Sequence, residues 1–197
     1  MKTVTTTTTL YTFNELGDDA RNNALTKLWD YLVDHEWYDH TIEEFKTTIA
    51  PLLGVSCTNV YFSGFASQGD GACFEGTFEY SKGMVANVKA HAPDDKELIE
   101  IAESIVAVQS KVFYRLHGSV SQRGHYNHSG CTAFTVYNHE DYATQDQEDS
   151  IKQCYRELMD WLYRQLEREY MYLTSEEALT EYFLDGDFEF TEDGNLY

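Results

Sequence analysis

Two segments of alternating apolar and polar residues, 59–67 and 72–80, constrain the fold of this chain most strongly. In the second segment Phe74 and Phe78 share one face, and the residues between them are mostly polar. Such alternation is typical of a strand with one buried face. The segments are separated by Gln-Gly-Asp-Gly, and an Asp-Gly pair favours a type I′ turn because glycine adopts positive φ. The pattern therefore predicts an antiparallel hairpin.

The remaining elements follow from apolar periodicity and from residues that begin or end helices. Runs of β-branched and aromatic residues predict further strands at 3–13, 112–120 and 132–138. Apolar residues spaced three and four apart predict helices that begin near Gly17, after His40, after Pro93 with Asp94 as cap, and near Gln147. Thr174 and Glu177 form a capping box that predicts a last short helix ending at Gly186.

These elements predict an α+β fold. The order of strands and helices lacks the regular alternation that a parallel, doubly wound sheet requires. No linker rich in proline, glycine or serine divides the chain. We therefore expect a single domain over residues 1–197, with about five mostly antiparallel strands and helices packed on one face.

The charge of the chain limits its partners. It carries 34 Asp and Glu against 14 Lys and Arg, a formal net charge of −20. Such a chain repels phosphate backbones and anionic lipid, so we expect neither direct nucleic-acid binding nor membrane binding. The four cysteines lack paired short spacings, and the N-terminus lacks the apolar run of a signal peptide. We therefore expect a cytoplasmic protein with reduced thiols.

The acidic residues are concentrated toward the C-terminus. Residues 174–197 contain eight Asp and Glu and no Lys or Arg. A solvated helix and tail would explain this charge through solubility alone. The alternative is an acidic face that competes for a basic surface, as proteins that mimic DNA do.

The glycine-rich turn carries more polar groups than a hairpin needs. Gly69 and Gly71 allow another backbone or a ligand to approach closely, and Ser67, Gln68 and Asp70 add hydrogen-bonding groups. The turn lacks the Gly-Lys-Ser/Thr and the following helix of a P-loop. A tip whose polar groups simply face water is the alternative interpretation.

A second polar segment lies near the end of the next predicted hairpin. His125 and His128 are three residues apart, and Cys131 follows three residues later, a spacing compatible with zinc. A fourth ligand with diagnostic spacing is missing, so we predict no metal and no cofactor. A plain polar connection, or histidines that hydrogen-bond a ligand together with Tyr126, are the other interpretations. Arg115 lies on the polar side of its predicted strand and is a candidate for the same edge.

Catalysis has weaker support than binding. Ser67 paired with His125 or His128 would resemble a nucleophile and its base, and Asp70 with Glu75 would resemble paired carboxylates. No third residue completes either arrangement, and the Gly-x-Ser-x-Gly elbow is absent. We therefore favour a protein without enzymatic activity.

Five segments together resemble a known group of proteins. They are 10–16 (LYTFNEL), 61–76 (YFSGFASQGDGACFEG), 113–116 (FYRL), 124–128 (GHYNH) and 163–170 (YRQLEREY). They resemble small proteins of tailed bacteriophages and prophages that are often labelled "antitoxin of toxin–antitoxin stability system". The resemblance implies a phage origin and a role against host toxins or host defence.

The residues and the resemblance lead to one functional hypothesis. We expect an antitoxin-like or anti-defence protein that neutralises a host toxin, a defence protein or a nucleotide-like immune signal in a polar pocket. The expected pocket residues are Ser67, Gln68, Gly69, Asp70, Gly71, Arg115, His125, Tyr126 and His128. The two polar loops should then lie together at one end of the sheet. The alternatives are an enzyme that degrades a small nucleotide-like signal and an acidic DNA mimic, and a homo-oligomer stays open.

Overall fold

The computed structural model describes residues 1–4, 7–33 and 36–197. Its contacts divide the chain into two compact units. The larger unit comprises Tyr38–Glu167, and the smaller unit comprises Met1–Trp37 with Arg168–Tyr197. The expectation of one domain over residues 1–197 stays a prediction. None of the helices in the described ranges combines the length and apolar character that a bilayer crossing needs.

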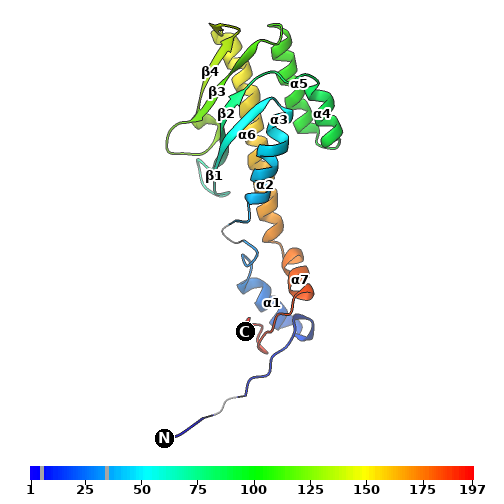
Figure 1. Cartoon of the computed structure of the whole chain (residues 1–197). Coiled ribbons are helices and arrows are strands. Elements are labelled where there is room, and N and C mark those ends of the chain that lie inside the picture. Colours follow the sequence, from blue (N-terminus) through cyan, green and yellow to red (C-terminus); the bar gives the residue numbers. More distant parts are fainter. Residues whose placement is uncertain (5–6, 34–35) are drawn as a thin grey trace. The chain divides into compact units, whose positions relative to one another are not determined.

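The larger unit contains a five-stranded antiparallel sheet whose strands follow one another in sequence order (Figure 1). The strands are β1 (Val55–Ser63), β2 (Gly71–Phe78), β3 (Leu116–Gln122), β4 (Thr132–Asn138) and β5 (Asp141–Tyr142). The predicted hairpin is present as β1 and β2, and the predicted strand 132–138 is confirmed. The predicted strand 112–120 begins later, because Phe113 and Tyr114 have φ of 55° and 61° and turn the chain.

Helices cover one face of this sheet, which confirms the predicted α+β class (Figure 1). In the larger unit they are α2 (Asp39–Glu44), a π-helical turn (Phe45–Ile49), α3 (Ala50–Leu52), α4 (Met84–His91), α5 (Lys96–Ser110) and most of α6 (Gln145–Leu173). The cap of α5 is Asp95 rather than the predicted Asp94, since the Asp95 side chain accepts the Leu98 N–H at 2.9 Å.

The core forms between the sheet and these helices. Alternate strand residues such as Phe74, Phe78 and Val120 are buried. The Phe78 ring packs 4.6 Å from the ring of Tyr155 in α6, and the Phe74 ring lies 5.6 Å from that of Phe45. The opposite face of the sheet, here called the outer face, carries the polar alternate residues.

The smaller unit is helical and has its own core. It holds a short 3-10 helix (Phe13–Glu15), α1 (Asp18–Lys27), the end of α6, and α7 (Glu176–Asp185). Its buried cluster consists of Phe13, Leu16, Ala24, Leu179, Phe183 and Phe190. The predicted strand at 3–13 is wrong for the described residues, because only Tyr11 pairs there, in an isolated bridge with Phe190, while residues 5–6 lie outside the description. The cap of α7 is Ser175 rather than Thr174.

Candidate functional site

The connection between β1 and β2 is longer than the four residues, 68–71, that separate the predicted strands. The last paired residues are Ser63 and Gly71, so seven residues form the loop. Asp70 folds it, because its Oδ2 accepts the N–H groups of Ala66 at 3.0 Å and Ser67 at 2.6 Å. The positive φ falls at Gly69 and Gly64 rather than at the Asp-Gly pair. The predicted hairpin is therefore correct and the predicted turn type is wrong.

The loop between β3 and β4 folds over the start of β2. A Cβ added at Gly69 would lie 2.8 Å from the Tyr126 ring, and one added at Gly71 would lie 2.5 Å from the His128 Cβ. Only glycine leaves room for these contacts. The structure thus brings loops 67–71 and 123–128 together at one end of the sheet, here called the loop end.

Hydrogen bonds hold both loops in place. The Asn127 side chain donates to the Phe62 carbonyl at 3.0 Å, which ties the second loop to β1. The Gln122 amide donates to the carbonyls of Gly124 at 3.2 Å and Tyr126 at 3.3 Å. The Asn127 bond joins residues 65 positions apart, and the two Gln122 bonds close the second loop on itself, so the loop end has a defined shape.

His128 and Cys131 form a pair within this arrangement. The Gly130 N–H donates to His128 Nδ1 at 3.0 Å, which places the proton of a neutral imidazole on Nε2. Nε2 lies 3.4 Å from the Cys131 Sγ. In the described part of the chain, no group of three or more His, Cys, Asp or Glu is arranged to hold a metal ion. The spacing that suggested zinc thus corresponds to a two-residue contact.

Glu75 organises the outer face beside the loops. Its carboxylate accepts the Tyr61 hydroxyl at 3.0 Å, the Asn59 amide at 3.3 Å and the Gln122 N–H at 3.0 Å. These hydrogen bonds, led by that from Asn59, lower the pKa of Glu75 below its ordinary value. The bond to Glu75 also raises the pKa of Tyr61. Asp70 and Glu75 therefore each accept hydrogen bonds from their own donors. This does not favour the interpretation that they act as a carboxylate pair.

Five side chains of the loop end are exposed, and two of them are Ser67 and Arg123. Gln68, His125 and Tyr126 all face solvent, and Tyr126 is 52% exposed. The His125 ring meets the Tyr126 ring edge-on at 5.4 Å. Among the described residues, no hydrogen bond joins the Ser67 hydroxyl to either loop histidine. The arrangement offers recognition groups, and the predicted pairing of Ser67 with a loop histidine is not formed among the described residues.

Arg115 does not belong to the loop end. It directly precedes β3, whereas the 123–128 loop follows the far end of that strand. Seven strand residues span about 20 Å, so the Arg115 side chain cannot share a pocket with Gln68 and His125. Its guanidinium lies over the Phe113 ring, 5.8 Å from the ring centroid. The prediction that Arg115 reaches the same edge as the loops is therefore wrong, and ligand binding by the other predicted residues stays a prediction.

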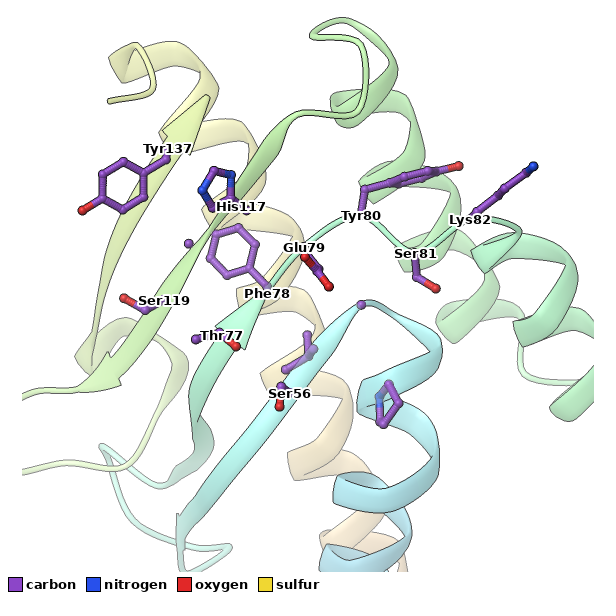
Figure 2. Close-up of a pocket in the computed structure, with 14 residues that line it drawn as sticks. Ser56, Thr77, Phe78, Glu79, Tyr80, Ser81, Lys82, His117, Ser119 and Tyr137 are labelled. Atoms are coloured by element: carbon purple, nitrogen blue, oxygen red, sulfur yellow. The ribbon is translucent and has the colours of Figure 1, made fainter. Parts of the chain in front are cut away.

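Sequence reasoning missed a hollow at the opposite end of the sheet. A cavity of about 740 Å³ opens there on the outer face, and Figure 2 shows the side chains that line it. The lining comes from the starts of β1 and β3, the ends of β2 and β4, and the 79–82 segment. The alternation of polar and apolar residues indicates from the sequence that Thr77 lies on the outer face. Which residues of the neighbouring strands lie beside Thr77 is known only from the strand register.

An antiparallel sheet backed by helices, with shaped loops at one end and an open cavity at the other, defines a small α+β domain. The chain belongs to the family described as "Domain of unknown function (DUF8835)", whose model matches residues 37–176. The match includes all five strands and both ends of the sheet. Comparison with curated proteins and with solved structures gave no significant match.

Proposed function

We propose that this protein neutralises a host toxin, a defence protein or a nucleotide-like immune signal by holding it at the loop end, without converting it chemically. The observation that carries the proposal is the contact between the two loops. Two polar loops from distant parts of the sequence are fixed against each other, and Gln68, His125 and Tyr126 remain exposed on them. A rigid polar surface loses little conformational entropy on binding, which favours affinity.

Binding is favoured over catalysis by the hydrogen bonds of the loop end. Asp70 accepts two backbone N–H groups, and His128 Nδ1 accepts a third. A general base needs a free lone pair within reach of the proton that it removes. His125 is the remaining candidate for a general base, and no residue orients its ring by a hydrogen bond in the described part of the chain.

The proposed phage origin of the protein rests on the motif resemblance.

The experiment is native mass spectrometry of the protein purified from infected bacteria. We expect a bound partner or ligand that is released by denaturation and lost in Gln68→Ala, His125→Ala and Tyr126→Ala. His40→Ala, at an exposed helical position, is the control for His125. Tyr172→Ala is the control for Tyr126, because the two rings are 53% and 52% exposed. Full retention of the bound mass by all three loop variants contradicts the proposal.

The same preparation distinguishes the two alternatives. An enzyme would release a chemically altered product, whereas a sequestering protein returns the ligand unchanged. A DNA mimic would act through its acidic residues and would weaken in high salt. Neutralising five acids of the C-terminal segment should then abolish activity while the loop variants stay active. These acids are Asp185, Asp187, Glu189, Glu192 and Asp193.

A further inference from the structure

The end of the sheet opposite the loops, here called the basic end, gathers positively charged and imidazole side chains. Two hollows adjoin there, of about 740 Å³ and about 380 Å³, and they share Glu79, Tyr80 and His117 as lining residues. Lys82 lines the larger hollow, and Arg115 with His139 lines the smaller. This collection is unusual in a chain with a net charge of −20.

Lys82 and Arg115 are the two permanent cations that line the basic end. Among the described residues, no ion pair includes Lys82 or Arg115. Glu79 is the acidic residue of the lining, and it lies exposed. A cation left unpaired in so acidic a protein is available to a negatively charged ligand.

The backbone at the basic end adopts conformations that side chains disfavour. Phe113, Tyr114 and His139 have φ of 55°, 61° and 61°, and in the described part of the chain they are the only residues other than glycine with positive φ. They flank Arg115, whose carbonyl accepts the His139 N–H at 3.3 Å. Left-handed residues of this kind persist where the surroundings fix them, and they concentrate at binding sites.

Gln109 supplies the fixing contact. This fully buried side chain donates to the Leu116 carbonyl at 2.7 Å and accepts the Leu116 N–H at 3.1 Å. The Gln109 carbonyl also accepts the Tyr114 N–H at 2.7 Å. The turn that presents Arg115 is therefore held from both sides and is preorganised.

Aromatic rings stand beside the cations. His117 at the start of β3 and Tyr137 at the end of β4 stack with their centroids 5.6 Å apart, and Figure 2 shows them next to each other. Tyr142 stacks on Tyr137 at 5.0 Å and is 75% exposed. Tyr80 and Tyr114 pair at 4.4 Å. Tyr137 therefore has a ring on each side, whereas His117 is exposed and lines both hollows. An exposed ring of this kind binds a planar group through its face.

A row of hydroxyl groups crosses the outer face next to the rings. Ser56 pairs with Thr77, Thr77 with Ser119, and Ser119 with Thr135, so four neighbouring strands each contribute one hydroxyl. All four side chains are exposed, and Figure 2 shows the first three facing the cavity. Hydroxyls both donate and accept, which suits the hydroxyl groups of a sugar.

We propose that the basic end binds a small ligand made of a phosphate group, a sugar and a planar ring, in the manner of a nucleoside monophosphate. The phosphate pairs with Arg115 and Lys82, the sugar faces the hydroxyl row, and the planar ring stacks on His117, which lines both hollows. The hollows have the volume of ordinary small-molecule sites. A single phosphate suits this acidic chain, which repels a long nucleic acid. The site is separate from the loop end and does not depend on the function proposed there.

The test is binding of adenosine 5′-monophosphate, adenosine and inorganic phosphate to the whole chain, measured by calorimetry. We expect the monophosphate to bind more tightly than either fragment. Arg115→Ala should weaken the monophosphate about tenfold or more and leave adenosine unchanged, since a hydrogen bond between charged groups is lost. His117→Ala should weaken adenosine and the monophosphate alike.

Arg123→Ala is the matched control, because it removes the same charge from an exposed position at the loop end. Equal weakening by Arg123→Ala and Arg115→Ala would show a nonspecific charge effect and overturn the proposal. Absence of monophosphate binding, or equal binding of the monophosphate and adenosine, would also overturn it. Lys82→Gln, which lies outside the strained turn, repeats the phosphate test if Arg115→Ala unfolds. Thermal unfolding of each variant checks the fold.

Discussion

The two ends of the sheet treat polar residues in opposite ways. At the loop end the polar side chains bond to the protein itself: Asp70 folds its own loop and Asn127 binds the backbone of β1. At the basic end Lys82 and Arg115 have no ion pair in the described ranges, and the backbone takes positive φ at residues that carry side chains. At the loop end, close packing against neighbouring side chains requires glycine at two positions. At the basic end, the unusual feature is positive φ at residues other than glycine.

This difference shows that glycine and polar residues in a motif do not by themselves indicate a ligand. Gly69 and Gly71 are explained by the side chains that lie against them. At the loop end, the side chains available to a ligand are therefore those that form no hydrogen bond within the described part of the protein. At the basic end the cations themselves remain available, so charge is the better indicator there.

Replacing a glycine by alanine should show the largest difference in stability between the two ends of the sheet. Gly71→Ala places a Cβ 2.5 Å from the His128 Cβ and 2.7 Å from its Cα, so the second loop must shift. We expect a loss of about 3 kcal/mol in the free energy of unfolding. Gly83→Ala, beside the basic end, meets nothing closer than 3.8 Å and should cost about 1 kcal/mol, owing to its φ of +81°. Urea denaturation of both variants measures the contrast, and equal losses would remove it.

Removing one carboxylate tests the internal bonds of the loop end. Asp70→Ala deprives the Ala66 and Ser67 N–H groups of their acceptor. We expect destabilisation of about 1–2 kcal/mol, reduced by the exposure of the loop to water. Asp141→Ala is a suitable control, because Asp141 is exposed and lies in a strand of the same sheet. If Asp70→Ala is as stable as the control, the loop is not held by this carboxylate.

The hydrogen bonds of Glu75 predict a smaller, pH-dependent effect. Its pKa is lowered in the folded chain, so its contribution to stability is present above the ordinary value of 4.5 and is lost as pH falls through the folded value. Glu75→Gln should therefore reduce stability at pH 7 and bring the variant closer to the parent as the pH falls below about 4. Unfolding in urea at pH 7, 5 and 3.5 measures the difference. A gap that stays constant with pH contradicts the assignment.

The smallest effect is expected at the basic end. Arg115→Ala removes an exposed cation with no ion pair in the described ranges, so stability should change by less than about 0.5 kcal/mol. Differential scanning calorimetry compares it with the parent chain. A loss as large as that of Asp70→Ala would mean that Arg115 supports the fold, and that the two ends do not differ in this respect.

The sequence predicted the sheet better than it predicted the sites. The alternation of apolar and polar residues predicted the β1–β2 hairpin and β4 correctly. One face of each strand is buried, and burial of one face gives the sequence an apolar period of two. The predicted strand at 3–13 is absent among its described residues, because β-branched residues form a strand only where a partner is available, and Tyr11 forms only an isolated bridge. The prediction that the two polar loops adjoin agrees with the structure.

Arg115 and the basic end show where sequence reasoning stops. The alternation of polar and apolar residues along a strand predicts the face of the sheet on which a side chain lies. It does not predict at which end of the sheet the residue lies. Lys82, Arg115 and His139 come from three separate turns, and only the strand register brings them to one end. The positive φ of Phe113 and Tyr114 has no sequence signature, because neither residue favours that conformation.

The bond between Gln109 and Leu116 also bears on the order in which the fold assembles. The two residues are seven positions apart, so closing this loop costs little entropy and takes well under a microsecond once α5 is present. The Gly69–Tyr126 contact joins residues 57 positions apart and must wait until the strands are paired. The turn before β3 is thus set locally and early, whereas the interlocked loops form among the last parts of the sheet.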